Sequence, residues 1–255
     1  MPPSVRKAVI PMAGKGTRFR PITHVVPKEF LPILNRPLID YVVQEAVSAG
    51  CEEIICVTAP GRELIRDYWP HTAFAAHRLT IVHQTEALGL GHAVGCAAAA
   101  VGNEPFFVLL PDIIIDAPTS VCTQLAQASA STQGRPVIAV RPEPTERLAS
   151  LGVVAVDASP TPLLPIRDLV EKPAPGTAPS NLTIVGRYLL PPTIFDDLRH
   201  ATPGAIGEIQ LTDALRTVAQ REGLSALQYS ETATFDCGTP SGWLAANQYF
   251  GKPRG

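Results

Sequence analysis

The sequence predicts an α/β fold with a Rossmann-like, mainly parallel (mixed) sheet flanked by helices, and a β lobe appended to it. Three observations predict this class. Over the first 150 residues, short apolar runs alternate with segments of helical spacing, a pattern typical of βαβ units. Beyond residue 150, the expected strands follow one another closely, as they do in antiparallel sheets. A chain of 255 residues with 45% apolar content can also bury a full core.

Each element of the first part follows from its apolar spacing. The segment 38–49 has apolar residues three and four positions apart, and Gly50 is its expected C-terminal stop. The run 105–112 is expected to be a buried strand that ends on the carboxylate of Asp112. The expected strands are 8–10, 53–59, 79–84, 105–112 and 136–140, and the expected helices are 38–49, about 61–69, 91–101 and about 119–129.

The second part has a different pattern. Its first strands should form the appended, more antiparallel region, and a proline-rich loop covers 172–180. The expected strands are 152–157, 166–173, 181–190 and a pair near 225–236, and the expected helices are about 208–222 and 239–250. We therefore expect a single domain over 1–255 with two parts, about 1–150 and about 151–255, the second of which carries the C-terminal helices.

Composition excludes several classes of function. A net charge of −2 gives no electrostatic case for a nucleic-acid partner or an acidic membrane surface. No apolar run approaches the roughly 18 residues of a membrane span, and the N-terminal segment does not resemble a signal peptide. The five cysteines form no CxxC pair, so we expect reduced thiols and a cytoplasmic location. Cysteine and histidine spacing shows no zinc site.

A glycine-rich loop directly follows the first strand. Gly14 and Gly16 allow backbone conformations that other residues resist, and such loops usually bring N–H groups close to an anion. The segment 84–93 and Asp112 also follow expected strands. Because ligands of open α/β sheets bind outside the carboxyl ends of the strands, these three features predict one phosphate-binding site.

The common nucleotide and hydrolase motifs do not match. The Rossmann pattern needs a third glycine and an immediate helix, but Phe19 and Pro21 follow the loop. The ATPase-type P-loop motif is absent, and 238–242 (GTPSG) misses the serine-hydrolase elbow by one position. Dehydrogenases, P-loop enzymes and serine hydrolases are therefore disfavoured.

The whole array of motifs resembles the sugar-1-phosphate nucleotidylyltransferases. The resemblance begins with Gly14-x-Gly16-Thr17-Arg18, Pro21, Thr23, Pro27-Lys28 and Pro32. It continues in order through GLGHAV (89–94), LLPD (109–112), GVV (152–154), VEKP (170–173), SNLTIVGRYLL (180–190), EIQLTDAL (208–215) and FDCG (235–238). The segments span roughly residues 7 to 250 and are most similar to the bacterial UTP–glucose-1-phosphate uridylyltransferases.

The resemblance implies the chemistry and the partners. An oxygen of a sugar 1-phosphate attacks the α-phosphorus of UTP or another nucleoside triphosphate, and pyrophosphate leaves. Main-chain N–H groups of Ala13, Gly14, Gly16 and Thr17 would hold the nucleotide. Arg18 would take the β- and γ-phosphates, and Lys28 would bridge the α-phosphate and the attacking phosphate. Asp112, also assigned to catalysis, and Asp236 would hold magnesium (Mg²⁺), a hard cation that prefers oxygen ligands.

The resemblance also implies that about 1–150 binds the nucleotide and that about 151–255, with the C-terminal helices, binds the sugar phosphate. It further implies the residues that select base and sugar. Gln84 would read the uracil edge, and the small Gly89 would let the base lie against the backbone. On the sugar side the implied residues are Gly152, Glu171, Lys172 and Gly186. Considered alone, the pair Glu171 and Lys172 would read as a surface ion pair, and His92 on the alanine-rich helix as a helix-start or packing residue.

Some points stay open at the level of the sequence. Leu151 stands where many relatives carry an aromatic residue, the stretch between Trp69 and Leu79 is short, and the sequence ends at Gly255 without the longer segment that relatives use in assembly. The sugar and the assembly state, including a homo-oligomer, are therefore undecided. The alternatives are a sister transferase for dTTP, another nucleotide or a cyclitol phosphate, and a non-catalytic nucleotide-binding homologue. Arg18, Lys28, Asp112 and Asp236 disfavour the last.

Overall fold

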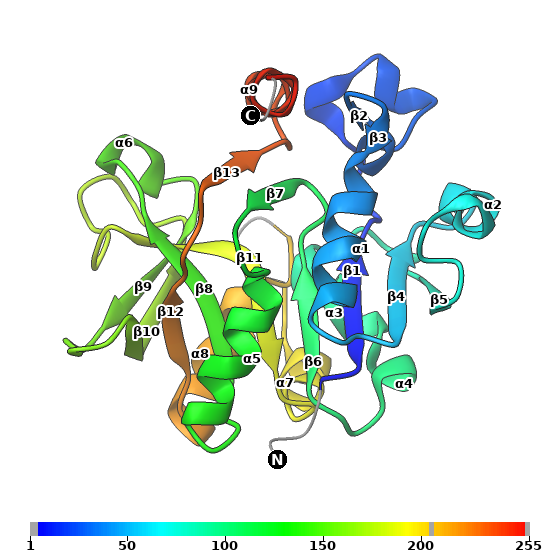
Figure 1. Cartoon of the computed structure of the whole chain (residues 1–255). Helices are drawn as coiled ribbons and strands as arrows, with labels where there is room; N and C mark the ends of the chain where they lie inside the picture. Colours follow the sequence, from blue (N-terminus) through cyan, green and yellow to red (C-terminus); the bar gives the residue numbers. More distant parts are fainter. Residues whose placement is uncertain (1–4, 204–206, 253–255) are drawn as a thin grey trace.

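The computed structural model describes residues 5–203 and 207–252. In these residues nine strands form one mixed sheet in the order β5-β4-β1-β6-β11-β8-β12-β10-β9 (Figure 1). The strands are β1 (Lys7–Pro11), β4 (Glu53–Thr58), β5 (Arg78–His83), β6 (Phe106–Leu109), β8 (Val137–Pro142), β9 (Gly152–Val156), β10 (Leu163–Glu171), β11 (Leu182–Leu190) and β12 (Ser225–Gln228). Two small antiparallel pairs are β2 (Pro32–Ile33) with β3 (Arg36–Pro37) and β7 (Ile113–Asp116) with β13 (Ala233–Asp236).

The first four long strands are parallel, as expected. Their order β5-β4-β1-β6 places the first strand in the middle, and the chain moves outward to β4 and β5 before it returns to β6. This return creates a topological switch point between β1 and β6, where ligands of open α/β sheets bind. The predicted mixed α/β fold is confirmed.

The placement of the segment 181–190 differs from the expectation. It forms β11, which lies in the middle of the main sheet between β6 and β8 and is antiparallel to both. β9 and β10 alone extend the sheet as the lobe, and β9 also contacts β11 through the pair Thr183 and Val153. Strand spacing along the sequence predicted an antiparallel partner but could not say which strand β11 would join, because pairing is decided by tertiary contacts.

Helices cover both faces of the sheet (Figure 1). They are α1 (Leu38–Ser48), α2 (Leu64–Tyr68), α3 (Leu90–Cys96), α4 (Ala98–Val101), α5 (Val121–Ser131), α6 (Thr145–Leu148), α7 (Ile194–His200), α8 (Leu211–Glu222) and α9 (Pro240–Phe250). Along β1, Ala8 and Ile10 pack with α1 and α5, whereas Val9 packs with α3, α7 and α8. Successive side chains of a strand point to opposite faces, so the run is apolar throughout.

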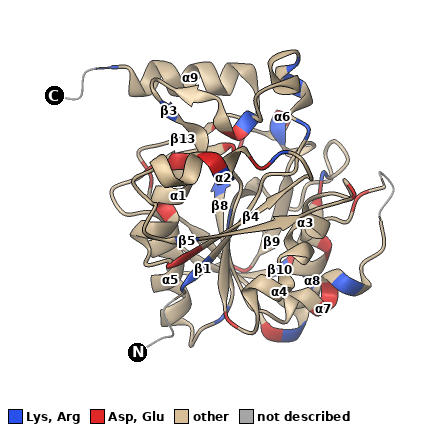
Figure 2. Ribbon diagram, turned by 90° about the vertical axis from the view of Figure 1, so that its right-hand side faces the viewer, with Lys and Arg blue, Asp and Glu red and all other residues tan. Residues whose placement is uncertain are grey.

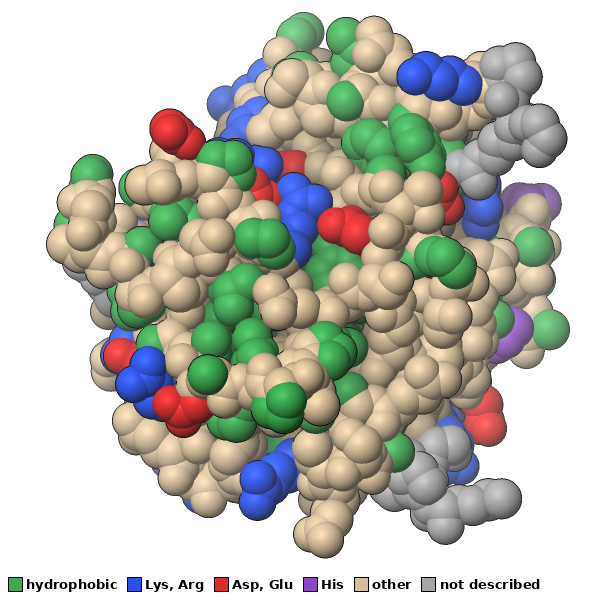
Figure 3. Space-filling view, turned by 60° about the vertical axis from the view of Figure 1, so that its left-hand side comes forward, with side chains coloured by type: hydrophobic (Ala, Val, Ile, Leu, Met, Phe, Trp, Pro, Cys, Tyr) green, Lys and Arg blue, Asp and Glu red, His purple; other side chains and the backbone are tan. Residues whose placement is uncertain are grey.

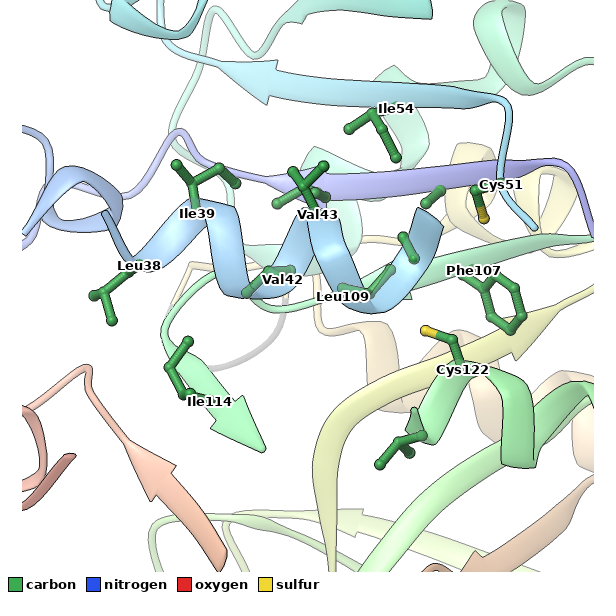
Figure 4. Close-up of a cluster of buried hydrophobic side chains, with 14 of the residues drawn as sticks. Leu38, Ile39, Val42, Val43, Cys51, Ile54, Phe107, Leu109, Ile114 and Cys122 are labelled. Carbon is green, nitrogen blue, oxygen red and sulfur yellow. The ribbon is translucent and has the colours of Figure 1, made fainter. Parts of the chain in front are cut away.

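The core beneath α1 shows why the periodicity of 38–49 predicted this helix. Leu38, Ile39, Val42 and Val43 are all buried and belong to one cluster with Ile54 of β4 (Figure 4). The other residues labelled in that view are Cys51, Phe107, Leu109, Ile114 and Cys122. This packing fixes α1, the first α-helix after the glycine-rich loop, against the sheet.

A few element boundaries differ from the expectation. The buried strand predicted for 105–112 ends at Leu109, so Asp112 lies in the turn between β6 and β7. The helix predicted for 91–101 is two short helices that meet at Ala97. The segment 11–33 contains three single 3-10 turns, Thr17–Phe19, Ile22–His24 and Lys28–Phe30, which its prolines hid from periodicity analysis.

Charged residues of both signs are spread over the molecule rather than gathered by sign (Figure 2). None of the helices in the described part of the chain has the length and apolar character needed to cross a bilayer. The C-terminal α9 packs on the loop ahead of α1, where Nε1 of Trp243 donates to the Pro32 carbonyl over 2.8 Å.

Candidate active site

The glycine-rich loop presents a row of main-chain donors at the carboxyl end of β1. In the described residues, no protein acceptor lies on the N–H groups of Ala13 to Thr17. Gly16 has a φ of 60°, and a Cβ there would come within 3.0 Å of Cγ2 of Thr23. Thr23 in turn donates its hydroxyl to the Gly16 carbonyl over 2.7 Å. Successive free amides in a glycine turn form an anion-binding concavity.

Lys28 and Asp112 form an ion pair in front of this loop. Both side chains are about four-fifths buried, with exposed fractions of 19% and 18%. Burial favours the neutral form of each group, but the opposite charge wins: it raises the pKa of Lys28 and lowers the pKa of Asp112. The positive charge of Arg18 also lowers the pKa of Asp112.

Asp236 faces the same point as Asp112. A Cβ added to Gly238 would lie 2.8 Å from Oδ2 of Asp112 and 3.0 Å from Oδ1 of Asp236, so glycine leaves the space between the two carboxylates open. The two segments are joined by the N–H of Cys237, which donates to the Asp112 carbonyl over 2.7 Å. This convergence was predicted only through the family resemblance, because the two aspartates are far apart in sequence.

The two carboxylates fit a magnesium ion. Mg²⁺ is usually held by one or two carboxylates together with substrate phosphate oxygens. In the described residues no group of three or more His, Cys, Asp or Glu side chains is arranged to hold a metal. Two carboxylates with an open space between them therefore suit a metal that arrives with a phosphorylated substrate.

A cleft of about 470 Å³ joins the loop to the ion pair. It is lined by Pro11, Ala13, Gly14, Lys15, Lys28, Gln84, Ala87, Gly89, Leu90, Ala93, Leu110, Pro111, Asp112 and Glu208. Six predicted site residues therefore meet in one hollow, although they follow three different strands. The space-filling view shows a hollowed face where acidic and basic side chains lie together (Figure 3).

Gln84 lies at the far end of the cleft and is held in place by its neighbours. Its amide nitrogen donates to the Gly89 carbonyl over 3.1 Å and lies 3.0 Å from Nδ1 of His92. No donor lies on its Oε1 in the described part of the chain. The free acceptor matches the N3–H donor of uracil. His92 was expected to be a packing or helix-start residue, and its contact with Gln84 was not predicted.

Gly89 is required by the backbone around it. Its φ is 95°, and a Cβ would lie 2.8 Å from Cβ of Glu208 and 3.0 Å from the Ile209 carbonyl. The segment ahead of α8 therefore packs directly on this glycine, with the N–H of Ile209 donating to the Leu88 carbonyl over 2.7 Å. The family resemblance predicted that Gly89 is small so that a base can lie against it. The structure adds a second reason, which is the close packing of Glu208 and Ile209 on this glycine.

Three of the four predicted sugar-side residues lie together. Gly152 pairs with Glu171 across β9 and β10, and Glu171 accepts a hydrogen bond of 2.7 Å from the hydroxyl of Thr212. Lys172 follows with a φ of 47°, and its Nζ lies 3.6 Å from Oε1 of Glu171. Oε2 of Glu171 is thus occupied by Thr212, whereas Oε1 is paired only with the half-exposed Lys172 side chain.

Gly186 is placed differently from the other three. Its carbonyl accepts from the N–H of Leu110 over 2.9 Å, and a Cβ there would lie 2.7 Å from the Leu110 side chain. It therefore packs on Leu110, beside the turn that carries Asp112.

The comparison with known proteins gives the family that the sequence motifs resemble. A family model described as Nucleotidyl transferase matches residues 7–252, almost the whole chain. The chain belongs to the nucleotidyl transferase family. The predicted enzyme class is confirmed, as is the resemblance to the bacterial uridylyltransferases.

Relatives of this nucleotidyl transferase match it from end to end. The UTP–glucose-1-phosphate uridylyltransferase of Bacillus subtilis (strain 168) is 39% identical over 96% of this chain and 91% of its own. A UDP-glucose pyrophosphorylase solved with UDP-glucose has a TM-score of 0.93 and 37% identity, covering 98% of this chain and all of the other. A UTP-bound enzyme from Acinetobacter baumannii has a TM-score of 0.88 and 36% identity, with 97% and 93% covered.

Three further residues of this nucleotidyl transferase were not predicted. Lys15 lines the cleft, and Nη2 of Arg147 lies 3.8 Å from Oδ2 of Asp236. Glu29 follows Lys28 and is buried, and its Oε2 has no partner among the described residues. Burial raises the pKa of Glu29 to about 7, against the opposing charges of Lys28 and Arg62. A charged residue after a lysine reads as solvated surface in a sequence, so nothing marked Glu29 as buried.

Proposed function

We propose that this chain transfers a uridylyl group from UTP to glucose 1-phosphate and releases UDP-glucose and pyrophosphate. The observation that carries the proposal is the single cleft that joins free loop amides, the pair of Lys28 and Asp112, and the free acceptor of Gln84. The uridylyltransferase relatives that match along the whole chain support the choice of substrates.

In the proposed reaction, a phosphate oxygen of glucose 1-phosphate forms a bond to the α-phosphorus of UTP. The bond from that phosphorus to the bridging oxygen breaks, and the electron pair leaves with pyrophosphate. Two polyanions must approach each other, so charge neutralisation and in-line positioning supply most of the rate enhancement. The N–H groups of 13–17 and Arg18 would hold the triphosphate, and the Lys28 ammonium would lie between the two reacting phosphates.

Magnesium is the cofactor that the carboxylates fit. Asp112 and Asp236 would hold it, since both carboxylates face the space above Gly238. The ion would supply positive charge to the phosphate oxygens. Because Lys28 pairs with Asp112, its ammonium would lie beside the metal as a second positive charge for the phosphates.

Base and sugar recognition would be divided between the two parts of the chain. Oε1 of Gln84 would accept from uracil N3–H, and the flat face of the base would lie on Gly89. The carboxylate of Glu171 would accept from glucose hydroxyls while Lys172 pairs with the sugar phosphate. We assign the nucleotide to about 1–150 and the sugar phosphate to about 151–255, within one domain.

Two further predictions concern the setting of the enzyme. All five cysteines are free thiols, and four of them are buried, which supports the proposed cytoplasmic location. A homo-oligomer stays a prediction, to be checked by light scattering of the purified chain.

A substrate panel tests the proposal. Pyrophosphate release is measured with glucose 1-phosphate and each of UTP, dTTP, GTP, CTP and ATP, and then with UTP and other sugar or cyclitol phosphates. We expect the highest kcat/KM for UTP with glucose 1-phosphate. Preference for dTTP would replace uridylyl by thymidylyl transfer, since only a methyl group distinguishes the bases, and binding without turnover of any pair would contradict the proposed activity.

A further inference from the structure

Arg187 is the largest fully buried side chain in the described structure, with an exposed fraction of 0%. It lies on β11, the strand that the sequence placed in the lobe and that pairs with β6 in the main sheet. A buried guanidinium is costly unless it is paired and every N–H group finds an acceptor. The acceptors that surround Arg187 therefore indicate which part of the structure this side chain supports.

The two terminal nitrogens of the Arg187 guanidinium bind the chain on both sides of the turn that carries Asp112. Nη1 donates to the Leu110 carbonyl over 3.1 Å, and Nη2 donates to the Ile113 carbonyl over 2.7 Å. These two carbonyls lie directly before and after Pro111–Asp112. The planar fork of one arginine thus holds both arms of the turn at once, which a lysine could not do.

The remaining donors of Arg187 connect the turn to helix α1. Nε lies 3.0 and 2.9 Å from the two carboxylate oxygens of Glu45, and Nη2 lies 2.9 Å from Oε2. Glu45 lies on α1, whose buried face is fixed in the core. The Glu45 charge neutralises the guanidinium, so the arginine can remain ionised under the turn.

Gly186 allows β11 to come close to the turn that carries Asp112. The register of β11 shifts between Ile184 and Tyr188, and Gly186 lies in this bulge with a φ of 73°. Its carbonyl accepts both from the N–H of Leu110 and from Nη1 of Arg187, over 2.9 and 3.2 Å. The bulge and the arginine together hold the Asp112 turn at the carboxyl end of β6.

We infer that Arg187 is a positioning residue that sets the Asp112 carboxylate for the metal and for Lys28, with Glu45 as its counter-ion. The inference rests on the proposed function, since it concerns the same metal site. Arg187 touches neither substrate nor metal, and it acts through the backbone on both sides of Asp112. Loss of such a supporting contact around a metal ligand typically costs about 10- to 100-fold in metal affinity.

The test is Arg187→Lys, which keeps the charge opposite Glu45 but loses the fork. UTP binding is measured by calorimetry without divalent ions and again with Mg²⁺, together with kcat and thermal melts. We expect the variant to bind UTP without metal as the wild type does, within about twofold. The gain in UTP affinity that Mg²⁺ provides should fall by about tenfold or more, and kcat should fall with it.

A second variant and a control separate positioning from stability. Glu45→Leu with Arg187→Met replaces the buried pair by apolar side chains, a change that often preserves folding, and it carries the same test should Arg187→Lys not fold. Arg221→Gln removes a bidentate pair with Asp197 between α7 and α8 and should leave the Mg²⁺ gain unchanged.

Two results would overturn the inference. One is an unchanged Mg²⁺ gain in folded Arg187→Lys or in the double variant, and the other is an equal loss of UTP affinity with and without metal. Failure of the proposed function gives a different result, because the wild type itself would then make no UDP-glucose.

Discussion

Lys28 and Asp112 are 84 residues apart in sequence, yet the lysine ammonium donates directly to the aspartate carboxylate. The contact joins the turn after the glycine-rich loop to the turn between β6 and β7. It places a cation and a carboxylate at the carboxyl ends of the neighbouring strands β1 and β6, the switch point of the sheet. In the proposed reaction the pair would link a fixed positive charge to a carboxylate that holds the metal.

The first prediction concerns the lysine charge. Lys28→Ala and Lys28→Met should each lower kcat by about 10²- to 10³-fold, because the ammonium stabilises charge as the two phosphates close on each other. Steady-state kinetics with thermal melts provides the measurement. Lys252→Ala, on the exposed residue after α9, is the control and should leave kcat unchanged. Near-normal turnover of a folded Lys28 variant would remove this residue from the mechanism.

The second prediction concerns the two carboxylates. Asp112→Asn and Asp236→Asn keep size and one neutral oxygen but remove an anionic ligand, so activity should collapse and the Mg²⁺ concentration for half-activity should rise in both. Magnesium titrations of initial rate are the measurement. Asp157→Asn, which removes only an exposed pair with Arg167, should retain the wild-type Mg²⁺ requirement. Full activity at wild-type Mg²⁺ in either site variant would contradict a shared metal.

The third prediction concerns the base. Gln84→Ala leaves the uracil N3–H without its acceptor and should cost roughly 1–3 kcal/mol in kcat/KM for UTP. His92→Ala should produce a smaller loss of the same kind, because it frees the Gln84 amide rather than removing it. The KM for glucose 1-phosphate should change little in both. A change confined to that KM would instead place Gln84 in the sugar pocket.

The fourth prediction concerns pH and Glu29. Burial raises the pKa of this carboxyl from 4.5 to about 7, so the folded state keeps a proton that the unfolded state has lost between these values. The contribution of Glu29 to stability is therefore full below about pH 4.5 and is lost as the pH rises through about 7. At higher pH the fold must hold an ionised carboxylate whose Oε2 has no partner.

Glu29→Gln removes this titration. Relative to wild type, the free energy of unfolding of the variant should rise between about pH 5 and pH 8, by up to about 3 kcal/mol. Urea denaturation at several pH values across this interval is the measurement. A difference between the two proteins that does not vary with pH would show that Glu29 does not titrate in the folded state.

The sequence alone determined the local parts of this protein. Apolar periodicity placed β1, α1, β4 and β5, because each pattern is written in consecutive residues that one strand or helix buries. Gly14 and Gly16 after an apolar run predicted an anion-binding loop for the same local reason. The ordered family motifs predicted the candidate site residues, and six of these residues line one cleft.

Only the tertiary structure decided how the local parts meet. Nothing near 181–190 shows that β11 joins β6 or that Arg187 lies beneath the Asp112 turn. Nothing near Lys28 shows that Glu29 is buried. Nothing in 84–92 shows that His92 fixes the amide of Gln84. Strand pairing, burial and ion pairing depend on which distant segments the packed core brings together. The energy of each of these contacts depends on residues that are close in space but distant in sequence. A short stretch of sequence does not specify which residues those are.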